Sequence, residues 1–144
     1  MRPAEAEVQS IIDARIDALS RKDAQAAVDL LANDVVAFEM VGPLALPGGA
    51  AIDVEGTAQW MSSWSGPILV EVRDQRIVTG SDLAFVHALH RLSGERVNGT
   101  TTDMWMRSTL GLERRAGEWR IVHAHTSLPF DPANNFRART DAKP

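Results

Sequence analysis

Two histidines near the end of the chain have the spacing of neighbours on one face of a β-strand. They are His123 and His125, in the segment WRIVHAHTSLPF at residues 119–130, and side chains two positions apart in a strand point the same way. An imidazole that faces a cavity can donate to a carbonyl oxygen or relay a proton. The structural alternative is a core histidine that hydrogen-bonds a backbone carbonyl, and this role is the favoured one for His123.

A single carboxylate, Glu39, stands in the otherwise apolar segment VVAFEMV. Burial would raise the pKa of this carboxyl group and make it a stronger base. Glu39 follows Phe38 directly, and consecutive side chains of a strand face opposite sides. If Phe38 belongs to the core, Glu39 therefore points outward, to solvent or to an interfacial arginine.

The orientation of the histidines depends on the last β-hairpin. If the AG pair at residues 116–117 forms a two-residue turn, counting back sets Leu110 opposite His123 and Ser108 opposite His125. The histidine face then also carries an apolar wall typical of a small-molecule pocket, formed by Met104, Met106 and Leu112. The opposite face, toward an expected subunit interface, holds Trp105, Arg107 and Thr109. A bulge would shift the register by one residue and exchange the two faces.

Two further pairs of residues bear on the cavity. Trp60 and Trp64 are four residues apart, hence on one face of a predicted helix. They can form an aromatic lid over the cavity mouth or, as the favoured alternative, simply pack the helix on the sheet. His87 and His90 fall on opposite faces of their strand, so at most one of them lines the cavity.

The elements that position these residues predict an α+β domain. Apolar spacings of three and four predict a helix over residues 5–20, and Asp23 can cap a second helix that ends at Asn33 and Asp34. A short strand, a loop rich in Gly and Pro, and a third short helix follow. Residues 68–130 then read as a meander of four long strands. Helices segregated from an antiparallel sheet form one domain over residues 1–144, with a core at 5–130 and a polar tail at 131–144.

Composition excludes several classes of protein. The net charge of −4 without a long basic run argues against nucleic-acid binding, and no segment reaches the ~20 apolar residues of a membrane span. The chain has no cysteine, no histidine–carboxylate spacing for a metal, no phosphate-binding glycine loop and no serine-hydrolase elbow. A cytoplasmic protein is expected.

Neither face of residues 119–128 is strongly polar, so a second subunit is expected to cover the face that the helices leave open, which predicts a homodimer.

Three helices on a curved antiparallel sheet resemble the cone-shaped nuclear transport factor 2-like fold, over about residues 5–130. The ending GEWRIVHAHTSLPF is similar to that of SnoaL-like domains. The run RRAGEWRIVHAH also resembles the hairpin of the association domain of calcium/calmodulin-dependent protein kinase II, where it closes a pocket in a domain that only assembles. The chain departs from that branch at Leu110, where an inward arginine would be expected for carboxylate binding.

The segment NDVVAFEMVGP resembles the strand of ketosteroid isomerase that carries its aspartate general base, and the resemblance sets Glu39 at that position. Ketosteroid isomerase pairs its base with a tyrosine oxyanion donor. This chain contains no tyrosine, so a histidine would have to replace the donor, and steroid isomerisation itself is not expected.

Two hypotheses follow. In the first, a small, mostly apolar carbonyl compound binds in the cone without a cofactor or metal. Glu39 removes a proton alpha to the carbonyl, and His125 stabilises the enolate oxygen. The predicted ligand contacts are His123, Trp60, Trp64, Ser108, Leu110 and Met106. In the second, the chain is a non-catalytic module that binds a ligand or stabilises an assembly.

Overall fold

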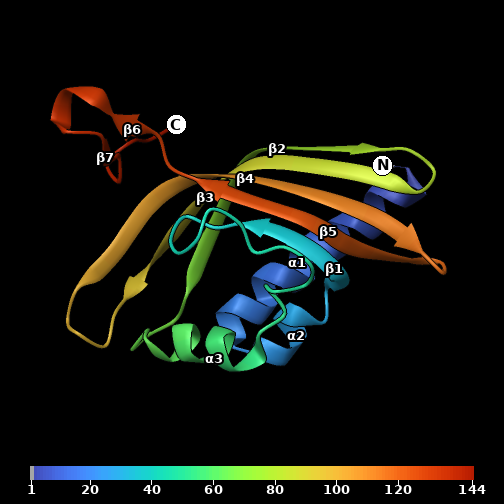
Figure 1. Ribbon diagram of the computed structural model, residues 1–144, viewed down its shortest axis with the longest axis horizontal. Coiled ribbons are helices and arrows are strands. Elements are labelled where there is room, and N and C mark those ends of the chain that lie inside the picture. Colours follow the sequence, from blue (N-terminus) through green and yellow to red (C-terminus); the bar gives the residue numbers. More distant parts are fainter. Residues whose placement is uncertain (1) are drawn as a thin grey trace.

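The computed structural model describes residues 2–144 and shows a strongly curved sheet wrapped around a long helix (Figure 1). The elements in chain order are α1 (Pro3–Arg21), α2 (Ala24–Val28), β1 (Leu31–Phe38), α3 (Val54–Ser62), β2 (Leu69–Thr79), β3 (Leu83–Glu95), β4 (Thr101–Arg115), β5 (Glu118–Ser127), β6 (Phe130–Asp131), a 3₁₀ turn (Pro132–Asn134) and β7 (Arg137–Ala138). Within residues 2–144, no helix combines the length and the apolar character needed to cross a membrane. The α+β class agrees with the prediction from the sequence.

The main sheet has five strands in the order β1-β5-β4-β3-β2. The pairs β2–β3, β3–β4 and β4–β5 are antiparallel, but β1 runs parallel to β5. The sheet is therefore mixed rather than purely antiparallel. A parallel pair requires a crossover connection, and here the connection is α3 together with the other three long strands. The strands β6 and β7 form a separate hairpin that projects from the body (Figure 1).

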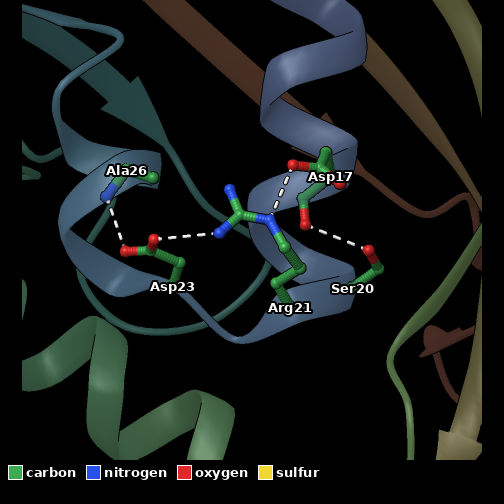
Figure 2. Close-up of polar contacts among 5 residues, drawn as sticks. All are labelled: Asp17, Ser20, Arg21, Asp23 and Ala26. Carbon is green, nitrogen blue, oxygen red and sulfur yellow. Dashed lines mark hydrogen bonds and ion pairs between the residues drawn. The ribbon is translucent and has the colours of Figure 1, made fainter.

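The turn between α1 and α2 confirms the predicted cap. The side chain of Asp23 accepts a hydrogen bond from the backbone N–H of Ala26, and Arg21 joins Asp17 to Asp23 (Figure 2). The second helix is shorter than the prediction, because it ends at Val28. The backbone of the next residues instead pairs with β5, where the N–H of Ile121 donates to the carbonyl of Leu30. Tertiary pairing thus overrides local helix propensity here.

Bulges curve the sheet. The pairing of β4 with β5 follows the predicted two-residue turn as far as Leu112 opposite Ile121, but the next pair is Gly111 opposite His123. Val122 is thus an extra residue in β5. Similar irregularities interrupt the β1–β5 and β2–β3 pairings. Because a bulge bends its strand and increases the twist, these interruptions help the sheet to curl around α1.

Two buried clusters fill the space inside the curve. The larger one joins α1 to the sheet through fully buried side chains that include Val8, Val35 and Ile121. The smaller one lies beneath α3 and consists of Trp64, which is 2% exposed, together with Ala24, Met61, Ile68 and Leu92. The candidate site lies between α1 and the concave face, where neither cluster fills the interior completely.

Candidate functional site

A small cavity lies between α1 and the concave face of the sheet. Its volume is about 30 Å³, which is enough for water but far below the 300–1,000 Å³ of typical ligand pockets. Four polar side chains line it, those of Arg15, Gln75, His90 and Ser108. The remaining lining residues are apolar and come from α1, β2, β3 and β4: Ile12, Ile16, Leu19, Val70, Val86, Ala88 and Leu110.

Helix and strand periodicity brings these side chains together. Arg15 follows Ile12 by three positions and precedes Leu19 by four, so it lies on the apolar stripe of α1. On β3, alternation directs His90 to the same face as the buried Ala88. Ser108 of β4 is the direct cross-strand neighbour of Ala88. The sheet therefore presents an imidazole and a hydroxyl toward the guanidinium of the helix.

Arg15 is a cation in a mostly apolar surrounding. It is half-buried, and among residues 2–144 its side chain forms no hydrogen bond or ion pair. Burial lowers the pKa of Arg15, and the negative charge of Glu39 partly offsets this effect. Because the pKa of a guanidinium ordinarily lies far above neutral, Arg15 stays charged at neutral pH. A partly desolvated cation without a counter-ion in contact favours the arrival of an anionic or strongly polar oxygen.

His90 is held in its neutral form. Burial lowers its pKa to about 4, and the positive charge of Arg15 adds to the effect. At neutral pH the ring therefore offers one N–H donor and one acceptor nitrogen. Gln75, the fourth polar lining residue, is already engaged through its amide, which donates to the side-chain oxygen of Gln9 at 2.7 Å. The groups open to a new partner are thus the guanidinium of Arg15, the imidazole of His90 and the hydroxyl of Ser108.

The two histidines of β5 face away from this cavity. The prediction that Leu110 faces His123 and Ser108 faces His125 is wrong, since His123 pairs with Gly111 and His125 pairs with Thr109. The cause is the bulge at Val122, which exchanges the faces of β5 beyond it. Both imidazoles lie on the outer, convex face of the sheet.

The outer position of these histidines is defined by contacts with β1. The Nδ1–H of His123 donates to the backbone carbonyl of Val36 at 2.7 Å. This is the structural role that the sequence favours for His123, a histidine hydrogen-bonded to a backbone carbonyl. The ring of Phe38 stands edge-on to both imidazoles, with centroids 4.8 Å from His123 and 5.4 Å from His125. His125 is exposed. A direct contact between either ring and a molecule in the cavity would require passage through the sheet.

Glu39 lies outside the lining of the cavity. It is exposed and directly follows the last residue of β1. Phe38 belongs to the outer face, whereas Ala37 is buried on the inner one, so strand alternation directs position 39 inward, toward α1. Its charge acts on Arg15, yet no ion pair joins the two. The carboxylate is therefore near the guanidinium and still accessible to water.

The other predicted contact residues divide into two groups. Ser108 and Leu110 line the cavity. Trp64 is buried in the cluster beneath α3, Met106 packs against that cluster, and the ring of Trp60 stands edge-on to Trp64 at 5.7 Å while remaining 38% exposed.

Of the two histidines on β3, His90 lines the cavity and His87 lies on the outer face. Arg15 was missed, although its position on the apolar stripe of α1 is visible in the sequence.

Comparison with known proteins agrees with this architecture. The SnoaL-like domain family matches residues 8–131 of the chain. An NTF2-like protein of unknown function from Pseudomonas putida is 29% identical, with a TM-score of 0.85 and coverage of 98% of this chain and 96% of the other. No curated protein matches the sequence.

Two more distant solved structures share the fold. A ketosteroid isomerase-like protein from Erwinia carotovora is 20% identical, with a TM-score of 0.71, over 88% of this chain and 97% of that one. A protein of Xanthomonas campestris, provisionally assigned as a calcium/calmodulin-dependent protein kinase II association domain, is 21% identical, with a TM-score of 0.72, over 88% and 91%. The NTF2-like cone predicted from the sequence is thus confirmed.

Proposed function

The chain belongs to the SnoaL-like domain family, and we propose that it binds a small, mostly apolar carbonyl compound in the cavity beneath α1. The observation that carries this proposal is the half-buried guanidinium of Arg15, which has no hydrogen-bonding partner among residues 2–144 and stands beside the neutral His90 and the hydroxyl of Ser108. Donors of this kind, placed on an apolar wall, suit the oxygen of a carbonyl group.

Binding requires the cavity to widen. Its 30 Å³ accommodates water only, so a ligand has to displace the long side chain of Arg15 or shift α1 on the sheet. Arg15 can move without losing a hydrogen bond, because it makes none with residues 2–144. Glu39, whose charge acts on Arg15, offers a negative charge toward which the guanidinium can turn.

The same arrangement suits a proton transfer without a cofactor. In this proposal Glu39 accepts a proton from the carbon alpha to the carbonyl, the C–H bond breaks, and its electron pair moves onto the carbonyl oxygen as an enolate. Arg15 and His90 then stabilise the enolate oxygen, a role for which preorganised donors are effective. His125 has no part in this proposal, because it lies on the outer face of the sheet.

Replacing Glu39 with glutamine is expected to slow this proton transfer by at least about 100-fold, because the amide cannot accept the proton. The exchange of the methyl protons of acetophenone in D₂O, followed by ¹H NMR with and without protein, measures the reaction. Glu55→Gln, at an exposed position of α3, is the matched control and should exchange at the wild-type rate. Equal rates for Glu39→Gln and wild type, or no acceleration by the wild-type protein, would refute the enzymatic proposal.

The outer face of the sheet supports a second candidate function, association of two copies of the chain. Phe38 and Phe85 are 37% and 47% exposed there, and one cross-strand row joins Phe38, His125, Thr109, His87 and Arg76. An isologous dimer needs a self-complementary surface. This face carries the aromatic rings together with both charges, such as Arg91 paired with Glu71 and Asp103.

Phe85→Glu is expected to convert such a dimer to a monomer, because it places charge at the centre of an apolar contact that has to lose its water. Light scattering coupled to size-exclusion chromatography measures the mass of the particle. Leu44→Glu is the control, since Leu44 is 99% exposed in the loop after β1. A wild-type particle with the mass of one chain, or a Phe85→Glu variant that keeps the mass of two, argues against this interface.

A further inference from the structure

The charges around the cavity define the ligand more narrowly than the family does. Among the lining residues, Arg15 is the only one that carries a charge at neutral pH, because His90 is neutral and Gln75 and Ser108 are uncharged. A neutral carbonyl oxygen would leave this partly buried cation without a counter-charge, which is costly. A dianion such as a phosphate monoester would bring a second negative charge for which the lining has no cation.

We infer, on the basis of the proposed function, that the ligand is a small monocarboxylate whose two oxygens bind Arg15 and whose apolar tail lies along the wall between α1 and the sheet. A carboxylate matches the planar fork of a guanidinium, which can donate two parallel hydrogen bonds to it. The hydroxyl of Ser108, on the strand facing α1, can donate to a carboxylate oxygen that lies between helix and sheet. A carbonyl next to the carboxylate is compatible with this inference and would supply the acidic carbon.

The apolar lining defines the other end of the ligand. Ile12 and Ile16 face the cavity from α1, whereas Val86 and Leu110 are direct cross-strand neighbours on the floor. These side chains offer no polar partner to a second hydrophilic group. A short alkyl or aryl tail therefore fits the wall, and each methylene of that tail that leaves water adds to the affinity.

Glu39 regulates access to this site. Its negative charge acts on the same guanidinium, so it competes with an incoming carboxylate for Arg15 and repels it. Removal of that charge should tighten carboxylate binding. The proposed proton transfer predicts a change in a different quantity for the same substitution, namely loss of turnover, so affinity and turnover of a single variant test the two proposals separately.

The experiment compares hexanoate with hexanamide, which has nearly the same shape and no charge, by isothermal titration calorimetry at pH 7.5. We expect hexanoate to bind at least about tenfold more tightly than hexanamide, since a charge-assisted pair with Arg15 replaces a neutral contact. Arg15→Met should remove this preference, and Arg15→Lys should restore part of it as a point charge without the bidentate fork. Arg21→Met, at the end of the same helix and outside the cavity, should retain the wild-type preference.

Glu39→Gln is expected to bind hexanoate about two- to fivefold more tightly than wild type and hexanamide with unchanged affinity. Equal affinities for hexanoate and hexanamide would overturn the carboxylate inference and leave the carbonyl-binding proposal standing. Binding of hexanoate that persists in Arg15→Met would likewise overturn it, as would absence of hexanoate binding to the wild-type protein. Thermal melts of each variant establish that a lost preference does not reflect unfolding.

Discussion

Replacing Arg15 with methionine is expected to stabilise the unliganded protein by about 1–3 kcal/mol, because it exchanges an unpaired, partly buried cation for an apolar side chain of similar length. Methionine can follow the same path between Ile12 and Leu19 along α1 and fill the 30 Å³ cavity. The attraction to Glu39 that is lost is weak, since the two side chains form no ion pair. Urea denaturation at pH 7.5 gives the free energy of unfolding of both proteins.

Arg21→Met provides the control for this substitution. Arg21 pairs with Asp17 and Asp23 at exposed positions, where water screens an ion pair and leaves it little effect on stability. We expect this variant to be unchanged or slightly less stable. A loss of stability in Arg15→Met of more than about 1 kcal/mol would mean that the guanidinium makes stabilising contacts in solution. A gain would instead identify a residue retained at a cost in stability, as expected for a binding group.

The parts of the fold that depend on local chemistry could be predicted from the sequence. Asp23 caps α2 as expected from its position before a helical stripe. Ala116 and Gly117 form the predicted two-residue turn with φ values of 50° and 80°, which match the left-handed conformations of a type I′ turn. Both features depend on a few adjacent residues, so the sequence carries the complete signal.

The orientation of the two histidines of β5 could not be predicted in the same way. In the segment IVHAH, neither of the two alternating sets of side chains is clearly polar or clearly apolar. The sequence pattern therefore does not show which set faces the core, and a shift of the register by one residue leaves no visible mismatch. The bulge at Val122 has no glycine or proline to mark it. Gly111 lies opposite His123, where an added Cβ would approach that of the histidine to 3.4 Å, but this close approach is evident only once the strands are paired.

The parallel pairing of β1 with β5 also lay beyond the sequence pattern, because it joins segments about 90 residues apart through the path of the whole chain. Arg15 is a different case. Its spacing from Ile12 and Leu19 sets it on the buried stripe of α1, and a cation on such a stripe is a recognised sign of a functional group. Helical periodicity therefore identifies a site residue that the strand pattern does not.

Lowering the pH from 7 to 4.5 is expected to cost the protein about 2 kcal/mol of stability through His90 alone. The pKa of this imidazole is about 4 in the folded protein, against 6.5 for an unperturbed histidine. Between these values the unfolded chain binds a proton that the native state excludes, so the free energy of unfolding falls as the pH falls. The loss begins near pH 6.5 and is complete near pH 4. The difference between the two pKa values sets about 3 kcal/mol as the upper limit of the whole effect, and the partial exposure of His90 keeps the actual loss below that limit.

His90→Gln should remove this loss, because glutamine supplies polar groups of similar size and does not titrate. His87→Gln is the matched control, since His87 lies on the same strand but on the opposite, exposed face, and it should keep the wild-type pH dependence. Urea denaturation at pH 7 and 4.5 measures the difference for all three proteins. Parallel losses in wild type and His90→Gln would show that the imidazole is solvated or paired, contrary to the structure.

The ring protons of His90 provide an independent measure, because NMR titration reports the midpoint of this residue directly. Burial is the larger cause of its lowered pKa and the charge of Arg15 the smaller one. In Arg15→Met the midpoint should therefore rise, but only part of the way toward 6.5. A midpoint that does not change in this variant would mean that the guanidinium and the imidazole do not share one cavity, and it would remove the geometric basis for an oxygen ligand held between them.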